Sequence, residues 1–484
     1  MKLRIAAMVM AMLACACGST VRQAARPASS SDAEFGSPAG SADATDGGEA
    51  TGSNSVAAAS GPTAPRSQRS AATNVAVSGA AVTTPIELGF VRTGVSNAAA
   101  FGASLGNSIS ETDIDNALVA AFNDRGGIAG RRILPVYADT DTGSTSWDTD
   151  FAEACASFTQ DHKVAAVLGY VFTHLDSFEG CLASKKIPHL STTFNVPDAP
   201  TLRQYPLLIA LSTPLIERRS IAKIDGALAT GAATRASKLG VVIDDCPSTK
   251  AAWAKTIRPY LAAKSLTVTA TFEVGCAHGA GDAGAEAARA GSLVLQFRSA
   301  GVDTVMFMTV SEGPALLIFS GGAEAQGYHP RYIVSSLANA AVLENQIPAR
   351  QAANVDGYGW LPVQDVRPQY WPGLTSTAKR CLDLLKTKSI VPSAPADYAF
   401  AFSACEALFA YETALKATRG RSDGAAIVGA IEAVGTTGYT SVMNLGGRAS
   451  FSKTRHDAPG DARHFAWTPS CTCFTYRSTN VLMP

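Results

Sequence analysis

The chain carries little charge and no excess of either sign. Of its 484 residues 17% are charged, and 40 Lys and Arg side chains balance 40 Asp and Glu side chains. Proteins that bind DNA or RNA gather basic residues on one face, and no stretch of this sequence does so. The composition therefore argues against a nucleic-acid partner.

Long apolar runs and catalytic patterns are also missing. After residue 18, no segment has the roughly 18 or more uncharged apolar residues that a membrane-spanning helix needs. We find no nucleophile–base pair, no phosphate-binding loop and no metal-ligand cluster. We therefore expect a protein that is not an enzyme and needs neither a cofactor nor a metal.

The first residues form a secretion signal. Lys2 and Arg4 precede an apolar run, Ile5–Ala16, which is too short to span a bilayer, and small residues follow. The stretch Ala14-Cys15-Ala16-Cys17-Gly18 resembles the lipobox of bacterial lipoproteins, in which a lipidated cysteine becomes the new N-terminus. We expect residues 1–17 to be a lipoprotein signal peptide with Cys17 as the lipidated residue. The alternative is an ordinary signal peptide with a chance cysteine.

Ten cysteines help to choose between Cys15 and Cys17. Lipidation of Cys17 discards Cys15 and leaves an even number for disulfides, which suits an oxidising compartment outside the cytoplasm. The sequence alone does not fix how these eight pair. They are Cys155, Cys181, Cys246, Cys276, Cys381, Cys405, Cys471 and Cys473.

Residues 18–82 are almost wholly Ala, Ser, Gly, Thr and Pro, and Phe35 is the single aromatic residue among them. Such a segment cannot bury enough apolar surface to offset the entropy lost on ordering. We expect a disordered tether that lets a folded domain stand away from a membrane surface.

The rest of the chain alternates short strand-like blocks with longer segments of helical spacing, which predicts parallel sheets in an α/β fold. The expected strands are 85–91, 132–138, 164–168, 187–191, 238–243, 267–272, 304–309 and 331–334. The expected helices include 113–124, 150–160, 249–264, 288–299 and 313–325. Two runs of such units, before and after roughly Thr213, suggest two Rossmann-like lobes with a hinge.

Ligands of open parallel sheets bind beyond the carboxyl ends of the strands. Here those positions carry small residues, hydroxyls and carboxylates, namely 92–94, 169–173, 192–195, 244–245 and 311–312. Hydroxyls and loop amides can hold a carboxylate, and an acidic side chain can hold an ammonium. The pattern suits a small polar or zwitterionic ligand.

The segment Asn123–Arg132, with Gly126-Gly127-Ile128 at its centre, resembles the turn after the first helix of type I periplasmic binding proteins. More narrowly, it is similar to the branched-chain amino-acid binding proteins of ABC importers. Val164–Gly169, Ile187–Ser191, Gly301–Val305 and Gly446–Phe451 continue the likeness in order. The resemblance implies lobe one from 83–212 plus 337–448 and lobe two from 213–336 plus 449–480.

The same resemblance implies five ligand-binding residues. Phe101 matches an aromatic residue near the ligand, Thr173 a hydroxyl that holds its carboxylate, and Glu312 the acid that faces its ammonium. Thr193 and Asn195 match two positions after the fourth strand. One departure is that 244–249 has no tyrosine where the family usually has a Tyr-Gly pair.

Plainer interpretations stay open for these residues. Glu312 can simply cap the helix that follows it, since carboxylates favour helix N-termini. Thr173, Thr193 and Asn195 can be turn residues, Phe101 can be core, and His174 can be polar surface. Cys471 and Cys473 near His464 lack the usual spacing of a metal site.

Three cysteine pairs are favoured. The family often bridges the positions of Cys155 and Cys181. Cys246 and Cys276 follow two strands that are expected to be neighbours, and Cys381 and Cys405 lie on two late predicted helices.

The resemblance implies that the protein captures a small polar solute, an amino acid or a relative. The solute binds one lobe first, the other lobe closes over it, and the protein delivers it to an ABC importer permease. The protein would work outside the cytoplasm, at the outer face of the cell membrane or in the periplasm, held to the membrane by its lipid. Two alternatives stay open: a ligand-sensing receptor with the same fold, and an envelope protein that has lost its ligand.

Overall fold

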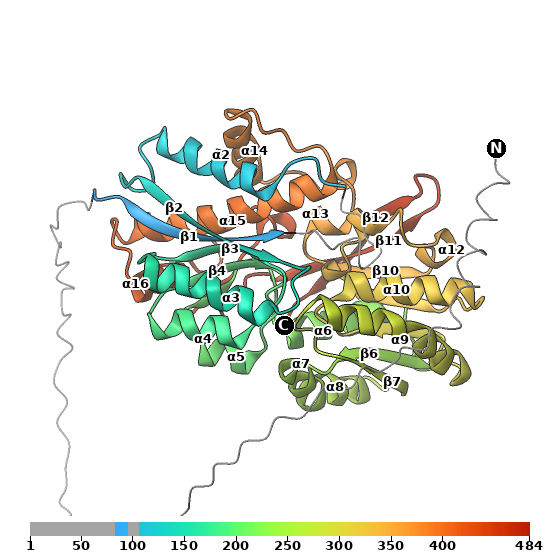
Figure 1. Ribbon diagram of the computed structural model, residues 1–484. Coiled ribbons are helices and arrows are strands. Elements are labelled where there is room, and N and C mark those ends of the chain that lie inside the picture. The colour runs from blue at the N-terminus through green and yellow to red at the C-terminus, as the bar shows by residue number, and fades with distance from the viewer. Residues whose placement is uncertain (1–82, 95–105) are drawn as a thin grey trace, which may run out of the picture. The chain divides into compact units, whose positions relative to one another are not determined.

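The computed structural model describes residues 83–94 and 106–484 (Figure 1). They belong to a single unit, Val77–Pro484. The expected signal peptide with Cys17, the tether 18–82 and Phe101 lie outside the described residues. Within the described residues, no helix is long and apolar enough to cross a membrane.

Sheet one belongs to lobe one, and its strands are all parallel in the order β2-β1-β3-β4-β5. Apolar side chains lie buried along these strands, as expected of a parallel sheet covered on both faces. The strands are β1 (Ile86–Gly94), β2 (Ile133–Asp141), β3 (Val167–Val171), β4 (His189–Thr193) and β5 (Leu208–Ala210).

Helices cover both faces of sheet one (Figure 1). One face carries α3 (Trp147–Ala156), α4 (Asp176–Ser184) and α5 (Ala199–Gln204), and a π-helical turn, Ser157–Asp161, extends α3. The other face carries α2 (Glu111–Asn123) together with helices from the late part of the chain, namely α14 (Ser376–Lys386) and α15 (Pro395–Ala417). The helix α16 (Gly424–Val434) packs against α15.

The glycine pair after α2 explains the sharp turn into β2. Gly126 and Gly127 have φ of +91° and +78°, a region that other residues resist. A Cβ on Gly127 would lie 1.9 Å from the Arg131 carbonyl oxygen. At the other end of α2, the Ser110 hydroxyl caps the helix by accepting a hydrogen bond from the Asp113 amide.

Sheet two has the order β12-β11-β10-β9-β8-β6-β7 and belongs to lobe two. Five of its strands in the described residues are parallel: β6 (Leu239–Asp244), β7 (Val268–Val274), β8 (Thr304–Phe307), β9 (Arg331–Ser335) and β10 (Val355–Gly359). The antiparallel hairpin of β11 (Asp461–Thr468) and β12 (Cys473–Leu482) extends it.

Alternate residues of the central strands point to opposite faces of sheet two, so both faces need cover. Val241 and Ile243 join one apolar cluster and Val242 joins another. The helices of lobe two are α6 (Ile216–Thr230), α7 (Pro247–Ala252), α8 (Arg258–Ala263), α9 (Ala280–Ser299) and α10 (Glu312–Ala325), with the π-helical turn Trp253–Ile257 between α7 and α8. Shorter helical turns are Ser336–Ala338, α11 (Ala340–Leu343), α12 (Ala349–Ala352), α13 (Pro362–Asp365), Pro368–Tyr370 and Leu445–Gly447.

The expected α/β class with two mostly parallel sheets is confirmed, but one expected lobe limit is wrong. The sequence places 337–448 in lobe one, whereas β10 lies in sheet two and pairs in parallel with β9. The chain therefore returns to lobe one only after Gly359. The segment Gly446–Phe451, which resembles a late turn and strand of the family, contains a 3-10 turn and no strand.

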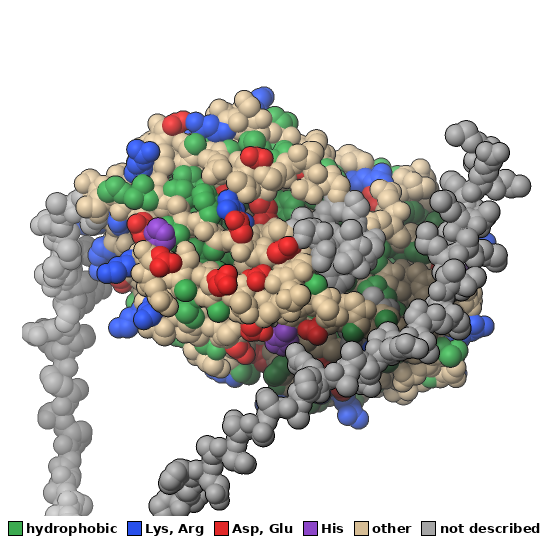
Figure 2. Space-filling view, in the orientation of Figure 1, with side chains coloured by type: hydrophobic (Ala, Val, Ile, Leu, Met, Phe, Trp, Pro, Cys, Tyr) green, Lys and Arg blue, Asp and Glu red, His purple; other side chains and the backbone are tan. Residues whose placement is uncertain are grey.

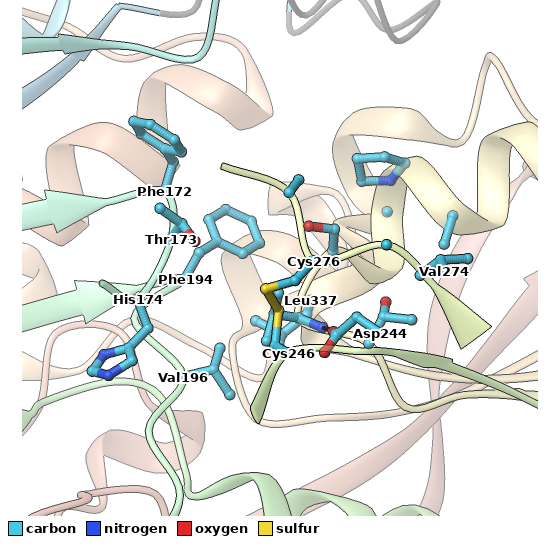
Figure 3. A pocket seen from close by; sticks show the side chains of 18 of the residues that line it. Phe172, Thr173, His174, Phe194, Val196, Asp244, Cys246, Val274, Cys276 and Leu337 are labelled. Atoms are coloured by element: carbon cyan, nitrogen blue, oxygen red, sulfur yellow. Dashed lines mark hydrogen bonds between the residues drawn. A yellow bond between two sulfur atoms is a disulfide. The ribbon is translucent and has the colours of Figure 1, made fainter. Parts of the chain in front are cut away.

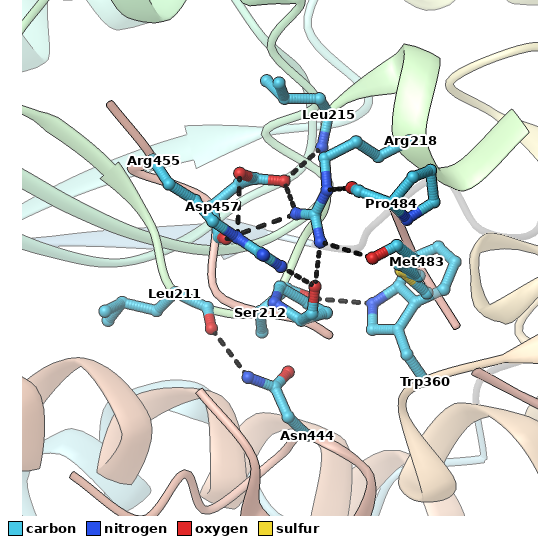
Figure 4. Close-up of polar contacts among 11 residues, drawn as sticks. Leu211, Ser212, Leu215, Arg218, Trp360, Asn444, Arg455, Asp457, Met483 and Pro484 are labelled. Carbon is cyan, nitrogen blue, oxygen red and sulfur yellow. Dashed lines mark hydrogen bonds and ion pairs between the residues drawn. The ribbon is translucent and has the colours of Figure 1, made fainter. Parts of the chain in front are cut away.

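The segments that cross between the lobes bind one another (Figure 4). The Trp360 indole donates a 2.7 Å hydrogen bond to the Ser212 carbonyl, and Leu445 N–H donates one of 2.8 Å to the Trp360 carbonyl. The Asn444 amide donates to the Leu211 carbonyl at 3.0 Å. Close by, the Arg218 guanidinium pairs with the Asp457 carboxylate. Buried hydrogen bonds thus join all of these crossings into one hinge region.

Four disulfides are present in the described residues. They join Cys155 to Cys181, Cys246 to Cys276, Cys381 to Cys405 and Cys471 to Cys473. The first three are the pairs that the sequence favours. On the face shown in Figure 2, Lys and Arg side chains lie at separate places and do not form one continuous patch.

Candidate ligand-binding cleft

A cavity of about 460 Å³ lies between the lobes, at the carboxyl ends of strands from both sheets. Lobe one contributes residues that follow β3 and β4, and lobe two contributes residues that follow β6, β7, β8 and β9. In Figure 3, Phe172, Thr173 and Phe194 face the Cys246–Cys276 disulfide and Leu337 across this space. A ligand here would touch both lobes at once.

Both lobes contribute aromatic side chains to a largely apolar cavity wall. Lobe one provides Trp147, Phe172 and Phe194, and lobe two provides Phe272, Phe307 and Phe319. The Trp147 and Phe172 rings pack edge to face with their centroids 5.0 Å apart. Such rings give a large apolar contact area in fixed positions, which suits a ligand with a flat apolar body.

The charged groups of the wall are mainly carboxylates. Asp148 and Asp176 lie near the surface and Asp244 is 3% exposed, with His174 and His278 as the ionisable nitrogen groups. Among the described residues, no Lys or Arg lines the cavity. The same part of the chain has no cluster of His, Cys, Asp and Glu that could hold a metal.

The lobes touch at the mouth of the cavity. The loop after β7 lies against the start of α3: Trp147 N–H donates to the His278 carbonyl at 2.8 Å, and Ala280 N–H donates to the Ser144 carbonyl at 2.9 Å. The His278 ring also pairs with the Asp148 carboxylate at 2.8 Å. We call residues 276–280 the mouth loop. The Cys246–Cys276 disulfide ties its first residue to the end of β6.

Of the site residues expected in lobe one, Thr173 lines the cavity, whereas Thr193 and Asn195 are absent from its wall. Phe194 and Val196 line it in their place. Thr193 has φ of +64°, its N–H donates to the Ser212 hydroxyl at 2.9 Å, and its carbonyl accepts from Thr213. The main chain therefore directs residues 193 and 195 into the protein.

Asn195 organises a buried polar network behind the wall. Its Oδ1 accepts a 2.6 Å hydrogen bond from His174 Nδ1, and its Nδ2 donates to Glu179 at 2.9 Å. Glu179 also binds His189 Nδ1 at 2.9 Å. Burial acts to raise the pKa of Glu179, but the two histidines and Asn195 outweigh it, and the pKa lies below its ordinary value. Asn195 is thus a positioning residue for His174.

The family model "Periplasmic binding protein" matches residues 85–471. The chain belongs to this family. The match spans sheet one, sheet two except for β12, and every segment that lines the cavity. The resemblance to type I periplasmic binding proteins is therefore confirmed.

Solved structures show the same fold at low identity. An R. palustris solute-binding protein in complex with 4-hydroxybenzoate is 14% identical, with a TM-score of 0.59 over 83% of this chain and 98% of that one. The LivJ branched-chain amino-acid binding protein of Streptococcus pneumoniae, with isoleucine, is 18% identical, with a TM-score of 0.57 over 83% and 100%. The LivK leucine-binding protein of Thermotoga maritima is 14% identical, with a TM-score of 0.56 over 82% and 99%. A search of curated proteins gives no match.

In this periplasmic binding protein, Glu312 does not face the cavity. It is fully buried, and Oε1 accepts from Arg219 at 3.0 Å and from Lys223 at 2.5 Å. Oε2 accepts from the amide and hydroxyl of Ser335. With both oxygens engaged, the carboxylate is not placed to meet a ligand ammonium. Its role in the structure is to neutralise two buried cations.

Arg219 and Lys223 are the residues that sequence reasoning missed. Both are fully buried on α6, and burial lowers the pKa of the Lys223 ammonium to about 8. They lie four residues apart, so they share one face of the helix. Two cations on the buried face of a helix are a signal for a buried acid.

Asp244 is the buried acid that does reach the wall of this binding protein. Its Oδ2 accepts from Val310 N–H at 2.8 Å, which fixes the carboxylate at the end of β6. Burial raises its pKa, while the Thr249 hydroxyl, the Val310 amide and Arg219 act in the opposite direction. Asp244 lies in the segment where the family usually has the Tyr-Gly pair, so this chain has a buried acid, and no tyrosine, in that segment.

Proposed function

We propose that this chain is a lipid-anchored, extracytoplasmic solute-binding protein that captures a small polar solute, an amino acid or a relative, and delivers it to an ABC importer permease. The observation that carries the proposal is the cavity lined by both lobes. Its volume of about 460 Å³ falls in the usual range for small-molecule sites, about 300–1,000 Å³. A solute held by both lobes favours the closed arrangement over an open one.

The hinge and the mouth loop support a capture cycle. The crossing segments are joined near Trp360, so the lobes can rotate about one region, and the mouth loop meets α3 where they close. A solute enters when these mouth contacts are broken and is enclosed when they form. No covalent step is needed, and no described residue is assigned a catalytic role.

Membrane attachment through Cys17 supports delivery. A lipid on this residue would keep the binding domain near the permease, and the tether 18–82 would let it reach the pore. Thr173 supplies a hydroxyl at the lobe-one side of the cavity, where we propose that it contacts the carboxylate of an amino acid. Phe101 remains a proposed contact on sequence grounds alone.

The test has two stages. A thermal-shift screen of purified protein against amino acids, small amides, amines and organic acids should find solutes that raise Tm in proportion to their concentration. Uptake of each hit is then measured in intact cells with and without the gene. Lost uptake supports import, and unchanged uptake of a bound solute indicates a sensor instead. Absence of any hit in a wide screen would contradict solute binding.

A further inference from the structure

The lobe-two side of the cavity holds polar side chains whose hydrogen-bonding capacity the described residues do not fill. Asp244, Thr309 and Asn339 line the cavity, and their atoms Oδ1, Oγ1 and Oδ1 make no well-formed hydrogen bond within the described residues. The Thr249 hydroxyl and the Cys246 amide lie near the Asp244 carboxylate and act to lower its pKa, but no cation donates a hydrogen bond to it. Asp244 is 3% exposed and Thr309 is 1% exposed. Buried polar atoms are nearly always paired, so unpaired atoms in a cavity wall point to a ligand.

These three residues meet at one edge of sheet two. Asp244 ends β6, Thr309 follows β8 and Asn339 follows the turn after β9, and β6, β8 and β9 are neighbours in the sheet. The N–H of Val310, the residue after Thr309, donates a hydrogen bond to Asp244 Oδ2 and so holds the two positions close together. A single ligand group that donates several hydrogen bonds could therefore reach all three.

The nearby cations do not neutralise Asp244 through hydrogen bonds. The Arg219 guanidinium donates to Glu312 and to the Thr309 carbonyl, and the Lys223 ammonium donates to Glu312 and to the Phe307 carbonyl. Both side chains lie behind the wall. A ligand carboxylate placed at this edge would meet the Asp244 carboxylate and no described cation in the wall.

The rest of the cavity surrounds this edge with aromatic rings. Phe272 and Phe307 come from the lobe that carries Asp244, and Trp147, Phe172 and Phe194 face them from lobe one. Aromatic faces attract ammonium groups and pack well against flat apolar groups. The wall thus fits a molecule with an aromatic body and a terminal group that donates hydrogen bonds.

We propose that the solute is an amine with an aromatic body, and that its ammonium group binds Asp244 with Thr309 and Asn339 as further acceptors. This inference rests on the proposed solute-binding function and names the chemical class of the solute. Both an aromatic amino acid and an aromatic amine without a carboxylate carry this chemistry.

Calorimetry with three matched compounds separates these sources. Phenylalanine carries both an ammonium and a carboxylate, 2-phenylethylamine carries the ammonium alone, and 3-phenylpropionate carries the carboxylate alone. We expect one or both of the amines to bind wild-type protein at neutral pH, and 3-phenylpropionate to bind at least about 30-fold more weakly than the better amine. Tighter binding by phenylalanine than by phenylethylamine would identify an amino acid, and the reverse an amine without a carboxylate.

Asp244→Asn tests the residue, since it removes the charge and keeps the shape. Affinity for the amine should fall at least about 30-fold. Asp225→Asn, on the outer part of α6 and paired with Lys264, is the control and should change affinity less than about threefold. Tm and circular dichroism of both variants establish that they fold.

Three results would overturn the inference. The first is binding of 3-phenylpropionate as tight as that of the amines. The second is an amine affinity that Asp244→Asn leaves unchanged, and the third is leucine binding tenfold tighter than phenylalanine. Each leaves solute binding itself standing, because the protein still binds a solute in all three. The compounds are first compared on wild-type protein, so the proposal stays testable even where Asp244→Asn does not fold.

Discussion

The main-chain N–H of Trp147 donates a 2.8 Å hydrogen bond to the carbonyl oxygen of His278, and so joins α3 of lobe one to the mouth loop of lobe two. Neither side chain is needed for this bond, because it runs between main-chain atoms. Closure of the cleft therefore depends on how closely the two backbones can approach.

Gly279 is the residue that allows this approach. A Cβ at Gly279 would lie 2.3 Å from the Thr145 carbonyl oxygen, so Gly279→Ala should force the lobes apart at the mouth. Overpacking of this kind costs about 1–3 kcal/mol, and we expect ligand affinity to fall about tenfold. Calorimetry and small-angle scattering with saturating ligand measure the effect. Gly281→Ala is the control, since a Cβ there meets nothing within 4 Å. Equal affinities for both variants would rule out the mouth contact as a determinant of closure.

Glu312→Ala should lower the free energy of unfolding, and it should not remove a direct contact with the ligand. The substitution leaves Arg219 and Lys223 fully buried without their anion, which costs about 3–5 kcal/mol. Urea unfolding measures the loss. Glu273→Gln, which breaks the half-exposed pair with Lys250, should cost less than about 1 kcal/mol. A stable Glu312→Ala protein that no longer binds its solute would instead support a direct ligand role.

The stability lost on removing a disulfide should increase with the length of the loop that it closes. Cys155 and Cys181 are 26 residues apart, so replacing both with Ala should cost about 3 kcal/mol by loop entropy. Cys471 and Cys473 are 2 apart, and the same change there should cost about 1 kcal/mol. Thermal unfolding compares the two double variants. Thiol labelling of exported wild-type protein should find no reactive thiol among the eight cysteines, and four or more would reject the disulfide pattern.

His174 should make stability depend on pH above about 6.5. Burial acts to lower its pKa, but Asp176, Glu179 and Asn195 outweigh burial and raise it above the ordinary value of 6.5. A raised histidine pKa stabilises the fold fully below about pH 6.5, and that stability is lost as pH rises through the folded-state pKa. Glu179, with its lowered pKa, acts in the opposite sense and loses its contribution only as pH falls below about 4.5. Tm of wild type should therefore decline relative to His174→Gln as pH rises from about 6 to 9. Parallel curves would show that His174 is not charged in the folded protein.

Cys17→Ala should release the protein from membranes. Without the cysteine no lipid is attached, and cell fractionation should find the chain in the soluble or secreted fraction. Release by Cys15→Ala but not by Cys17→Ala would move the lipid site to Cys15. Membrane retention of both variants would argue against lipidation.

The fold could be predicted from sequence because its parallel strands are short, apolar and separated by helical spacing. The expected strands 238–243 and 331–334 differ from β6 and β9 by a single residue at either end. The strands β5 and β10 were not predicted. β5 has only three residues, and β10 (Val355–Gly359) contains two glycines and an aspartate. The hairpin β11–β12 follows the long helical region and is polar along much of its length.

The site was less predictable because side-chain direction depends on distant contacts. Whether Thr193 or Phe194 faces the cavity is decided by Ser212 and Thr213, which bind the main chain of Thr193 from another segment. Glu312 was assigned to the ligand because the partners that occupy it, Arg219 and Lys223, lie about 90 positions earlier in the chain. The residues next to Thr193 and Glu312 in the sequence do not indicate either set of contacts, because the partners come from other segments of the chain.

The Cys246–Cys276 disulfide forms part of the cavity wall and anchors the mouth loop. Disulfides form in oxidising compartments, whereas cysteine thiols stay reduced in the cytoplasm. If the chain is exported as we propose, a newly made copy still inside the cell lacks this disulfide, and its mouth loop is not linked to the end of β6. Tight solute binding would then begin only after secretion. Newly made protein would therefore not bind the solute that is already inside the cell.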